Sequence, residues 1–223
     1  MTQLVSSPVS SPVSSPVSSE VSPVATTFLL ATLLGLAVGA AGLLAESLVD
    51  SPVWISIFHR LAPWAAATVV MGVRLRGRPA AAAACGILTQ LGLVAGYYAT
   101  QAGVTGQGLD TRSATVYGVL AVLAGPAYGL AGAGLRNPSA RLRQLNIGVA
   151  CSPFLADGIR VIVGCLTIGR HVLPSTMVGE SYLVLGVGLA LLLARSRRDV
   201  VPGLVFGAAS AGLLMLGLDV VLA

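Results

Sequence analysis

Seven apolar runs, separated by short loops that carry clustered arginines, constrain this chain more than any other feature. The runs cover residues 26–44, 61–75, 80–100, 114–135, 145–168, 181–194 and 200–221. A hydrocarbon core about 30 Å thick needs about 20 helical residues, so the second and sixth runs are short and the others are long enough. The pattern predicts an all-α, polytopic transmembrane helical bundle.

The composition agrees with lipid as the solvent of most of the chain. Hydrophobic residues make up 55% of the sequence and charged residues 9%, and the mean hydropathy is +0.88. Soluble domains carry about a quarter of charged residues, which cover their surface. We therefore expect the lipid bilayer to be the main partner of this protein.

The basic residues lie in loops between the apolar runs. All 13 are arginine, and nine form three clusters. The clusters are Arg74, Arg76 and Arg78; Arg136, Arg141 and Arg143; and Arg195, Arg197 and Arg198. Arginine between spans is typical of cytoplasmic loops. The pattern predicts a multi-pass protein of the inner (plasma) membrane with these loops in the cytosol, and it excludes a nucleic-acid-binding face, because no soluble domain is available to hold one.

The second run decides the number of crossings. If residues 61–75 span the membrane, the bundle has seven helices, with a cytoplasmic N-terminus and an external C-terminus. If they are re-entrant, it has six helices and the N-terminus is external. The seven-helix arrangement is our prediction. Residues 1–24 repeat the unit SSPV, which favours a disordered Ser/Pro-rich tail, so that residues 25–223 form the bundle.

Glycine pairs predict where the helices pack. Lipid is as apolar as leucine, so helices gain most where small residues let their backbones approach closely. Four GxxxG motifs occur in the apolar runs, namely Gly35 and Gly39, Gly92 and Gly96, Gly125 and Gly129, and Gly203 and Gly207. Helical spacing extends three of these pairs into stripes, one of which runs from Gly118 through Gly125 and Gly129 to Gly132. We expect packing inside the bundle along these stripes.

The fifth run carries two charges one turn apart. On a helix, Asn146, Pro153, Asp157, Arg160 and Gly164 share an arc of about 60°. A charge facing lipid at mid-membrane costs at least about 2.5–3.5 kcal/mol, so this face must point into the bundle or into a wet cavity. Two interpretations remain open. Asp157 and Arg160 either neutralise each other structurally or line an outward-facing pocket for an anion, a zwitterion or a proton.

Three further polar residues are candidates for the same cavity. Gln90 and Tyr97 lie seven apart on one face of the third run, and Glu46 ends the glycine stripe of the first. Together with Asp157 and Arg160 they form our candidate ligand-binding set. The corresponding function is a small-solute binding or transport module. The alternative is a structural or assembly subunit without a ligand, either as a homo-oligomer or with a partner membrane subunit.

Motifs of known chemistry are missing from the sequence. It contains no HExxH, GxSxG, Walker or EF-hand pattern, so no residue is a catalytic candidate and a non-enzymatic role is favoured. The three cysteines, Cys85, Cys151 and Cys165, lie in apolar runs without metal-ligand spacing. We expect no metal site and no cofactor.

Four short motifs carry a resemblance to a known family. They are "APWAAATVVMGV" followed by arginines, "GLVAGYY", "LAGPAYG" and "FLADG". With these motifs, residues 27 to 222 resemble a family of uncharacterised bacterial multi-pass membrane proteins, known only as a domain of unknown function. The resemblance implies a polytopic fold and no activity. The chain also superficially resembles the substrate-binding subunits of energy-coupling-factor vitamin transporters, whose cytoplasmic C-terminus differs from the one predicted here.

The predicted orientation can be tested by thiol labelling. With the native cysteines replaced, Arg76→Cys, Ala140→Cys and Arg197→Cys should each resist a membrane-impermeant maleimide in intact cells, because all three positions are expected in the cytosol. Each should react after the membrane is permeabilised. Labelling of any of them in intact cells would contradict the arrangement.

Overall fold

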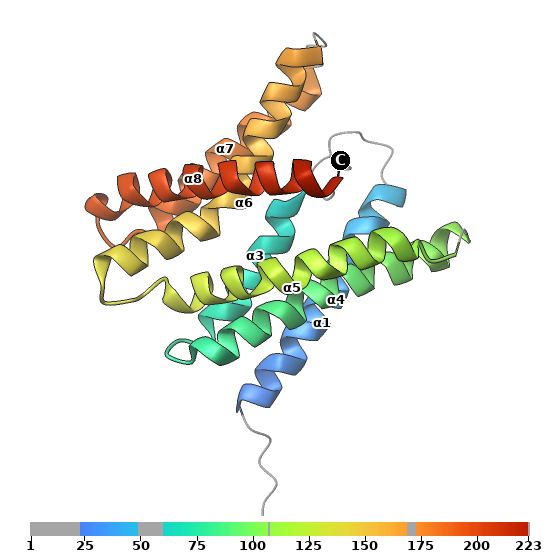
Figure 1. The fold of residues 1–223 in the computed structure, drawn as a ribbon, viewed down its shortest axis with the longest axis horizontal. Coiled ribbons are helices and arrows are strands. Elements are labelled where there is room, and N and C mark those ends of the chain that lie inside the picture. Colours follow the sequence, from blue (N-terminus) through green and yellow to red (C-terminus); the bar gives the residue numbers. More distant parts are fainter. Residues whose placement is uncertain (1–22, 49–59, 107, 169–172, 223) are drawn as a thin grey trace, which may run out of the picture.

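The computed structural model describes residues 23–48, 60–106, 108–168 and 173–222, and these form seven helices without a strand (Figure 1). The helices are α1 (Pro23–Leu48), α3 (Leu61–Val73), α4 (Pro79–Thr105), α5 (Thr111–Gly134), α6 (Ala140–Ile168), α7 (Leu173–Leu193) and α8 (Arg197–Leu222). Five of them, α1, α4, α5, α6 and α8, are long and apolar enough to cross a membrane. The predicted all-α bundle is confirmed. The predicted tail lies almost entirely outside the described residues.

The second and sixth apolar runs differ in how they fold. The second run forms the 13-residue α3, which at about 1.5 Å per residue reaches only about 20 Å. The helix of the sixth run is longer than predicted, because α7 has 21 residues and begins at Leu173 rather than at residue 181. A polar residue does not end a helix, because the backbone hydrogen bonds continue past it. Glu180 accordingly lies within α7 and is exposed on the surface of that helix.

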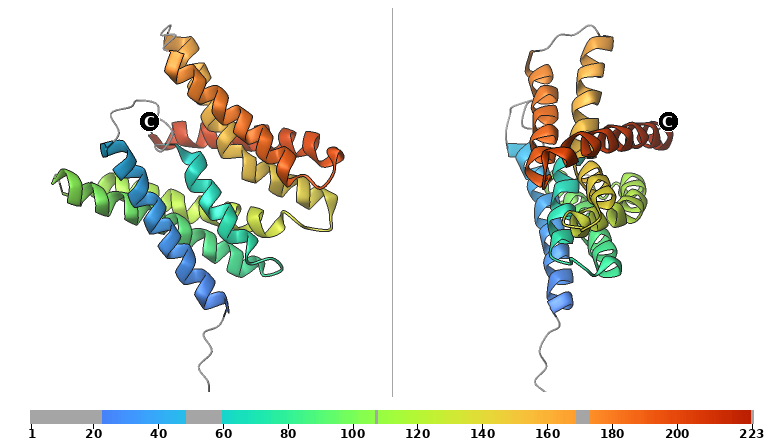
Figure 2. Two further views of the ribbon diagram at one scale, coloured as in Figure 1. Left: turned by 180° about the vertical axis from the view of Figure 1, so that it is seen from behind. Right: turned by 90° about the vertical axis from the view of Figure 1, so that its left-hand side faces the viewer.

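The three arginine loops lie at one end of the molecule (Figures 1 and 2). They are the connections α3–α4, α5–α6 and α7–α8. Helix α1 runs in the same chain direction as α4. Gly35 lies against Thr89 and Gly92, and Gly39, one turn later on α1, lies against Leu93, which is also later on α4 than Thr89. Since α4 starts at an arginine loop, α1 also starts at that end. This direction agrees with the seven-helix prediction.

Glycines pack α1 and α4 backbone to backbone, as predicted. A Cβ added to Gly35 or Gly39 would collide with the carbonyl oxygens of Thr89 or Leu93 on α4. In return, a Cβ on Gly92 would lie 2.8 Å from the Thr32 carbonyl oxygen on α1. The two motifs of the first and third apolar runs therefore face each other.

The motif on α5 contacts two helices at once. A Cβ on Gly125 would lie 2.8 Å from the Cα of Ile87 on α4, and one on Gly129 would collide with the Ala82 carbonyl. Gly132 lies against Val69 of α3 in the same way. Gly118 differs from the prediction, because a Cβ there would meet no atom within 4 Å.

Helix α8 packs on α6 through larger side chains. A Cβ on Gly203 would lie 3.0 Å from Cγ2 of Ile147, and one on Gly207 would lie 3.1 Å from Cδ1 of Leu155. The facing glycine on α6 is Gly148, which lies against Gly203 and Phe206. The fourth motif thus lies in a helix interface, as expected.

The glycine contacts predict a large effect for a single methyl group. Gly39→Ala should destabilise the protein by about 1–3 kcal/mol, because its Cβ meets a backbone carbonyl that cannot move aside. Gly212→Ala is the matched control, since a Cβ there meets open space. The measurement is thermal unfolding in detergent, and equal midpoints for the two variants would contradict the packing.

Candidate functional site

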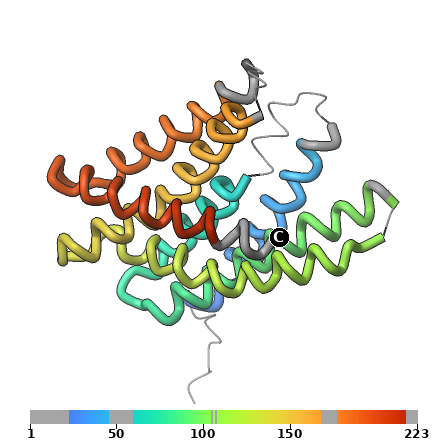
Figure 3. Tube along the Cα trace, turned by 45° about the horizontal axis from the view of Figure 1, so that its top comes forward, coloured from blue at the N-terminus to red at the C-terminus, as the bar shows by residue number. Residues whose placement is uncertain are grey.

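The helices form two groups that meet along α6. Helices α1, α3, α4 and α5 pack on one another and form the four-helix group, and α6, α7 and α8 form the three-helix group (Figure 3). The groups meet mainly where α6 contacts α3 and α5. A buried cluster fills this junction, consisting of Ala65, Val69, Tyr128, Leu135, Ile147, Ala150, Cys151 and Ala190.

Asp157 connects the two groups through a helix cap. Its side chain is 4% exposed, and its Oδ2 accepts a hydrogen bond of 2.9 Å from the backbone N–H of Ala62. It also interacts with the backbone N–H of Leu61. A helix start leaves up to four N–H groups without a partner, and Pro63 has none to donate. The carboxylate of α6 therefore satisfies the first turn of α3.

The described residue directly before α3 does not provide this cap. Arg60 precedes the helix and makes no capping hydrogen bond with its side chain. Its guanidinium instead attracts Asp157, and Arg160 adds a smaller attraction. The positive end of the α3 dipole further favours a carboxylate at this place. A helix start and two arginines thus offset part of the cost of burying the charge of Asp157.

Arg160 lies where α6 leaves the bundle. Its side chain is exposed, whereas Pro153 and Asp157 on the same face are buried. Beyond this point the outer ends of α6 and α7 project past the other helices (Figures 1 and 2). The predicted polar face therefore begins inside the molecule and ends at its surface. The side chain of Glu46 lies outside the described part of the structure.

Gln90 and Tyr97 contact the first turns of α3. The Nε2 of Gln90 donates to Oγ1 of Thr68 at 3.0 Å and to the carbonyl oxygen of Trp64 at 3.4 Å. The Tyr97 ring lies beside the Trp64 indole, with 6.0 Å between the ring centroids. Both residues share one face of α4, as predicted, and both meet Trp64 rather than Asp157.

A pocket of about 380 Å³ lies beside Gln90, in the half of the bundle away from the arginine loops. Its polar groups come from Trp64, Gln90, Tyr117 and Tyr128. The remaining lining residues are aliphatic and belong to α3, α4, α5 and α8, namely Leu61, Ala65, Val94, Leu120, Ala121, Leu123, Ala124, Leu213 and Leu214. We call this space the outer pocket. Of the candidate residues, it contains Gln90, while Asp157, Arg160 and Tyr97 lie outside its lining.

A second buried carboxylate, which was not among the predicted site residues, lies at the end of the bundle that carries the arginine loops. Asp199 is 2% exposed and accepts hydrogen bonds from Arg143, at 3.0 Å and 3.1 Å, and from Gln144 at 3.2 Å. Ser196 donates to the same carboxylate at 3.3 Å. The spacing Ser196-x-x-Asp199 resembles a helix-start signal and could have indicated the contact between these two residues, although not the partners on α6.

No metal-binding cluster occurs in the described ranges. Groups of three or more His, Cys, Asp or Glu side chains that could hold a metal ion are absent there. Cys85 and Cys151 are free and buried in helix contacts. The described helices therefore form a pocket and two internal polar connections.

These observations define a polytopic helical membrane protein with a pocket between its helices. The chain belongs to a family of unknown function (DUF6518), whose model matches residues 18–223. No curated protein and no solved structure matches the chain, so nothing supports the resemblance to energy-coupling-factor subunits. The resemblance to an uncharacterised membrane protein family is confirmed.

Removal of the Asp157 carboxylate tests its capping role. Asp157→Ala should destabilise the protein by about 1–3 kcal/mol, because it leaves a buried N–H of α3 without an acceptor. Asp157→Asn keeps an acceptor oxygen at the same place and should therefore lose less stability than Asp157→Ala. Thermal unfolding in detergent measures both variants. A larger loss of stability in Asp157→Asn than in Asp157→Ala would contradict the capping role of Asp157.

Proposed function

We propose that this protein is a small-solute binding module of the cell membrane and that the outer pocket is its binding site. The observation that carries the proposal is a cavity of about 380 Å³ with four polar side chains in an otherwise aliphatic lining. Ligand pockets commonly have volumes of about 300–1,000 Å³ and such a distribution of polar groups.

The lining indicates the class of solute. Among the residues that the structure describes, none that lines the outer pocket is charged, so an ion would lose its hydration without compensation from them. Trp64, Tyr117 and Tyr128 offer aromatic surfaces, and Gln90 offers an amide. A small, mainly apolar molecule with an aromatic ring and one polar group fits this chemistry. This solute differs from the anion, zwitterion or proton considered for a pocket around Asp157.

The position of the pocket favours entry from the bilayer. Leu123 of α5 and Leu213 of α8 line it and are 69% and 72% exposed. Helix α8 packs mainly on α6, and its Leu213 and Leu214 line the same pocket as residues of α5. Lipid-soluble molecules concentrate in the hydrocarbon and can reach the pocket between these helices.

Asp157 supports this site as a positioning residue. The first turn of α3 supplies Leu61, Trp64 and Ala65 to the lining, and Asp157 accepts the N–H of Ala62 in the same turn. The polar face of α6 thereby serves the pocket by holding the start of α3. In this proposal, Asp157 holds the start of α3 in place and does not itself contact the solute.

Quenching of Trp64 fluorescence tests the proposal. In a Trp54→Phe background, only Trp64 emits, and titration with 4-bromophenol should quench it saturably, because the bromine reaches the indole inside the pocket. Ala124→Phe fills the pocket and should weaken the apparent affinity at least about tenfold, which equals about 1.4 kcal/mol.

Ala127→Phe is the matched control on the same helix. Ala127 is exposed and lies outside the pocket lining, so this variant should titrate like the parent. Quenching that rises linearly without saturation, or equally in both variants, would overturn the binding proposal and favour a subunit without a ligand.

A further inference from the structure

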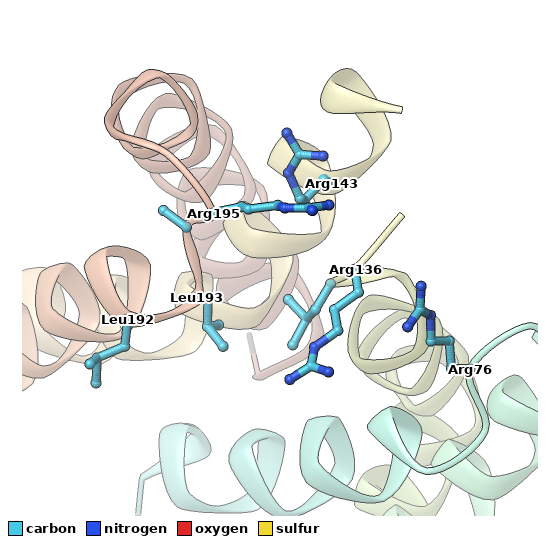
Figure 4. A pocket seen from close by; sticks show the side chains of 8 residues that line it. Arg76, Arg136, Arg143, Leu192, Leu193 and Arg195 are labelled. Carbon is cyan, nitrogen blue, oxygen red and sulfur yellow. The ribbon is translucent and has the colours of Figure 1, made fainter. Parts of the chain in front are cut away.

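A second cavity lies at the opposite end, between the arginine loops. Its volume is about 470 Å³, and its lining contains Arg76, Arg136, Arg143 and Arg195 (Figure 4). These arginines come from all three loop regions, which are distant in sequence. The other lining residues are Leu135, Leu192, Leu193 and Ala194, and none is acidic. We call this space the arginine pocket.

Three of the four guanidinium groups are available to a ligand. Arg143 is occupied by Asp199 and by the carbonyl oxygen of Asn137. Within the part of the chain that the structure describes, Arg76, Arg136 and Arg195 have no hydrogen-bond or ion-pair partner, and all three are exposed. Three unneutralised positive charges around one cavity favour an oxyanion such as a phosphate group, whose oxygens guanidinium groups bind with paired hydrogen bonds.

The cavity continues into an apolar groove. A neighbouring cavity of about 290 Å³ shares Arg76, Arg136 and three leucines with the arginine pocket and extends to Val73, Gly132 and Ala133. Leu192 lines both cavities and is 84% exposed, and Val73 is also exposed. The positive charges thus lie at the end of an aliphatic path that is open to the bilayer.

We propose that the arginine pocket binds the phosphate headgroup of an anionic membrane lipid, whose acyl chain follows the groove past Leu192 and Val73. A phosphate alone would use the guanidinium groups and leave the groove empty. A neutral lipid would use the groove and leave the charges uncompensated. Basic pockets between transmembrane helices are known to hold acidic lipid headgroups.

The site is independent of the outer pocket. It lies at the other end of the bundle, and the two linings share no residue. A lipid here would bridge Arg76 and Arg136 of the four-helix group to Arg195 of the three-helix group. Its binding would therefore stabilise the junction between the groups.

Native mass spectrometry of the full chain in an uncharged detergent tests this proposal. The probes are dioctanoyl phosphatidylglycerol, dioctanoyl phosphatidylcholine and inorganic phosphate, each titrated separately. Phosphatidylglycerol should bind at least about tenfold more tightly than either of the others, because only it offers both net negative charge and acyl chains.

A charge-matched pair of variants separates the pocket from the general positive surface. Arg136→Gln/Arg195→Gln should weaken phosphatidylglycerol binding at least about tenfold, whereas Arg78→Gln/Arg198→Gln, which removes equal charge outside the lining, should stay within about twofold. If the pocket double variant does not fold, the single variants replace it, each with a loss of about threefold or more.

Three results would overturn the proposal. Equal losses in both double variants would show attraction to the surface as a whole. Phosphatidylcholine binding as tightly as phosphatidylglycerol would remove the role of charge. Inorganic phosphate binding as tightly would identify a soluble oxyanion rather than a lipid as the ligand.

Discussion

Close contact between helix backbones is the interaction on which the rest of this structure depends. In lipid, burial of leucine brings little gain, so helices must gain from dispersion between closely packed atoms. Glycines on α1, α4, α5 and α3 bring carbonyl oxygens of one helix into contact with the Cα atoms of the next. These contacts place α3 and α4 beside α5, and this arrangement positions three of the four walls of the outer pocket.

The glycine motifs were predictable, but their partners were not. Spacing alone indicates that Gly35 and Gly39 face another helix, because the residues share one side of a helix. It cannot indicate that this helix is α4, since every apolar helix of the chain offers small residues. Gly86 and Gly72, which pack on α5, belong to no GxxxG pair and gave no signal. Gly118 fits the stripe on α5 but lies beyond the reach of the neighbouring helices.

For the buried charges, too, the local sequence predicts that a side chain is buried but does not predict its partner from a distant segment. A carboxylate in an apolar run must face the interior, and Asp157 does so. Its acceptor role could not be derived, because its donor is 95 residues away and is a backbone group without any sequence signature. The nearby arginine at 160 suggested a pair within one helix, whereas the start of α3 supplies a backbone N–H at 2.9 Å from the carboxylate. Of the candidate solute-binding residues whose side chains the structure describes, Gln90 alone lines the outer pocket.

The division into two groups of helices has a consequence for biosynthesis. All helices of the four-helix group precede residue 135, and their mutual contacts are complete without any later segment. Chains emerge from the ribosome from the N-terminus, and early units fold first. The first group can therefore assemble in the bilayer while α6 is still being translated. Until α6 arrives with its carboxylate, the N–H of Ala62 lacks the acceptor that Asp157 provides, so docking of the second group adds the capping hydrogen bond to a helix of the first group.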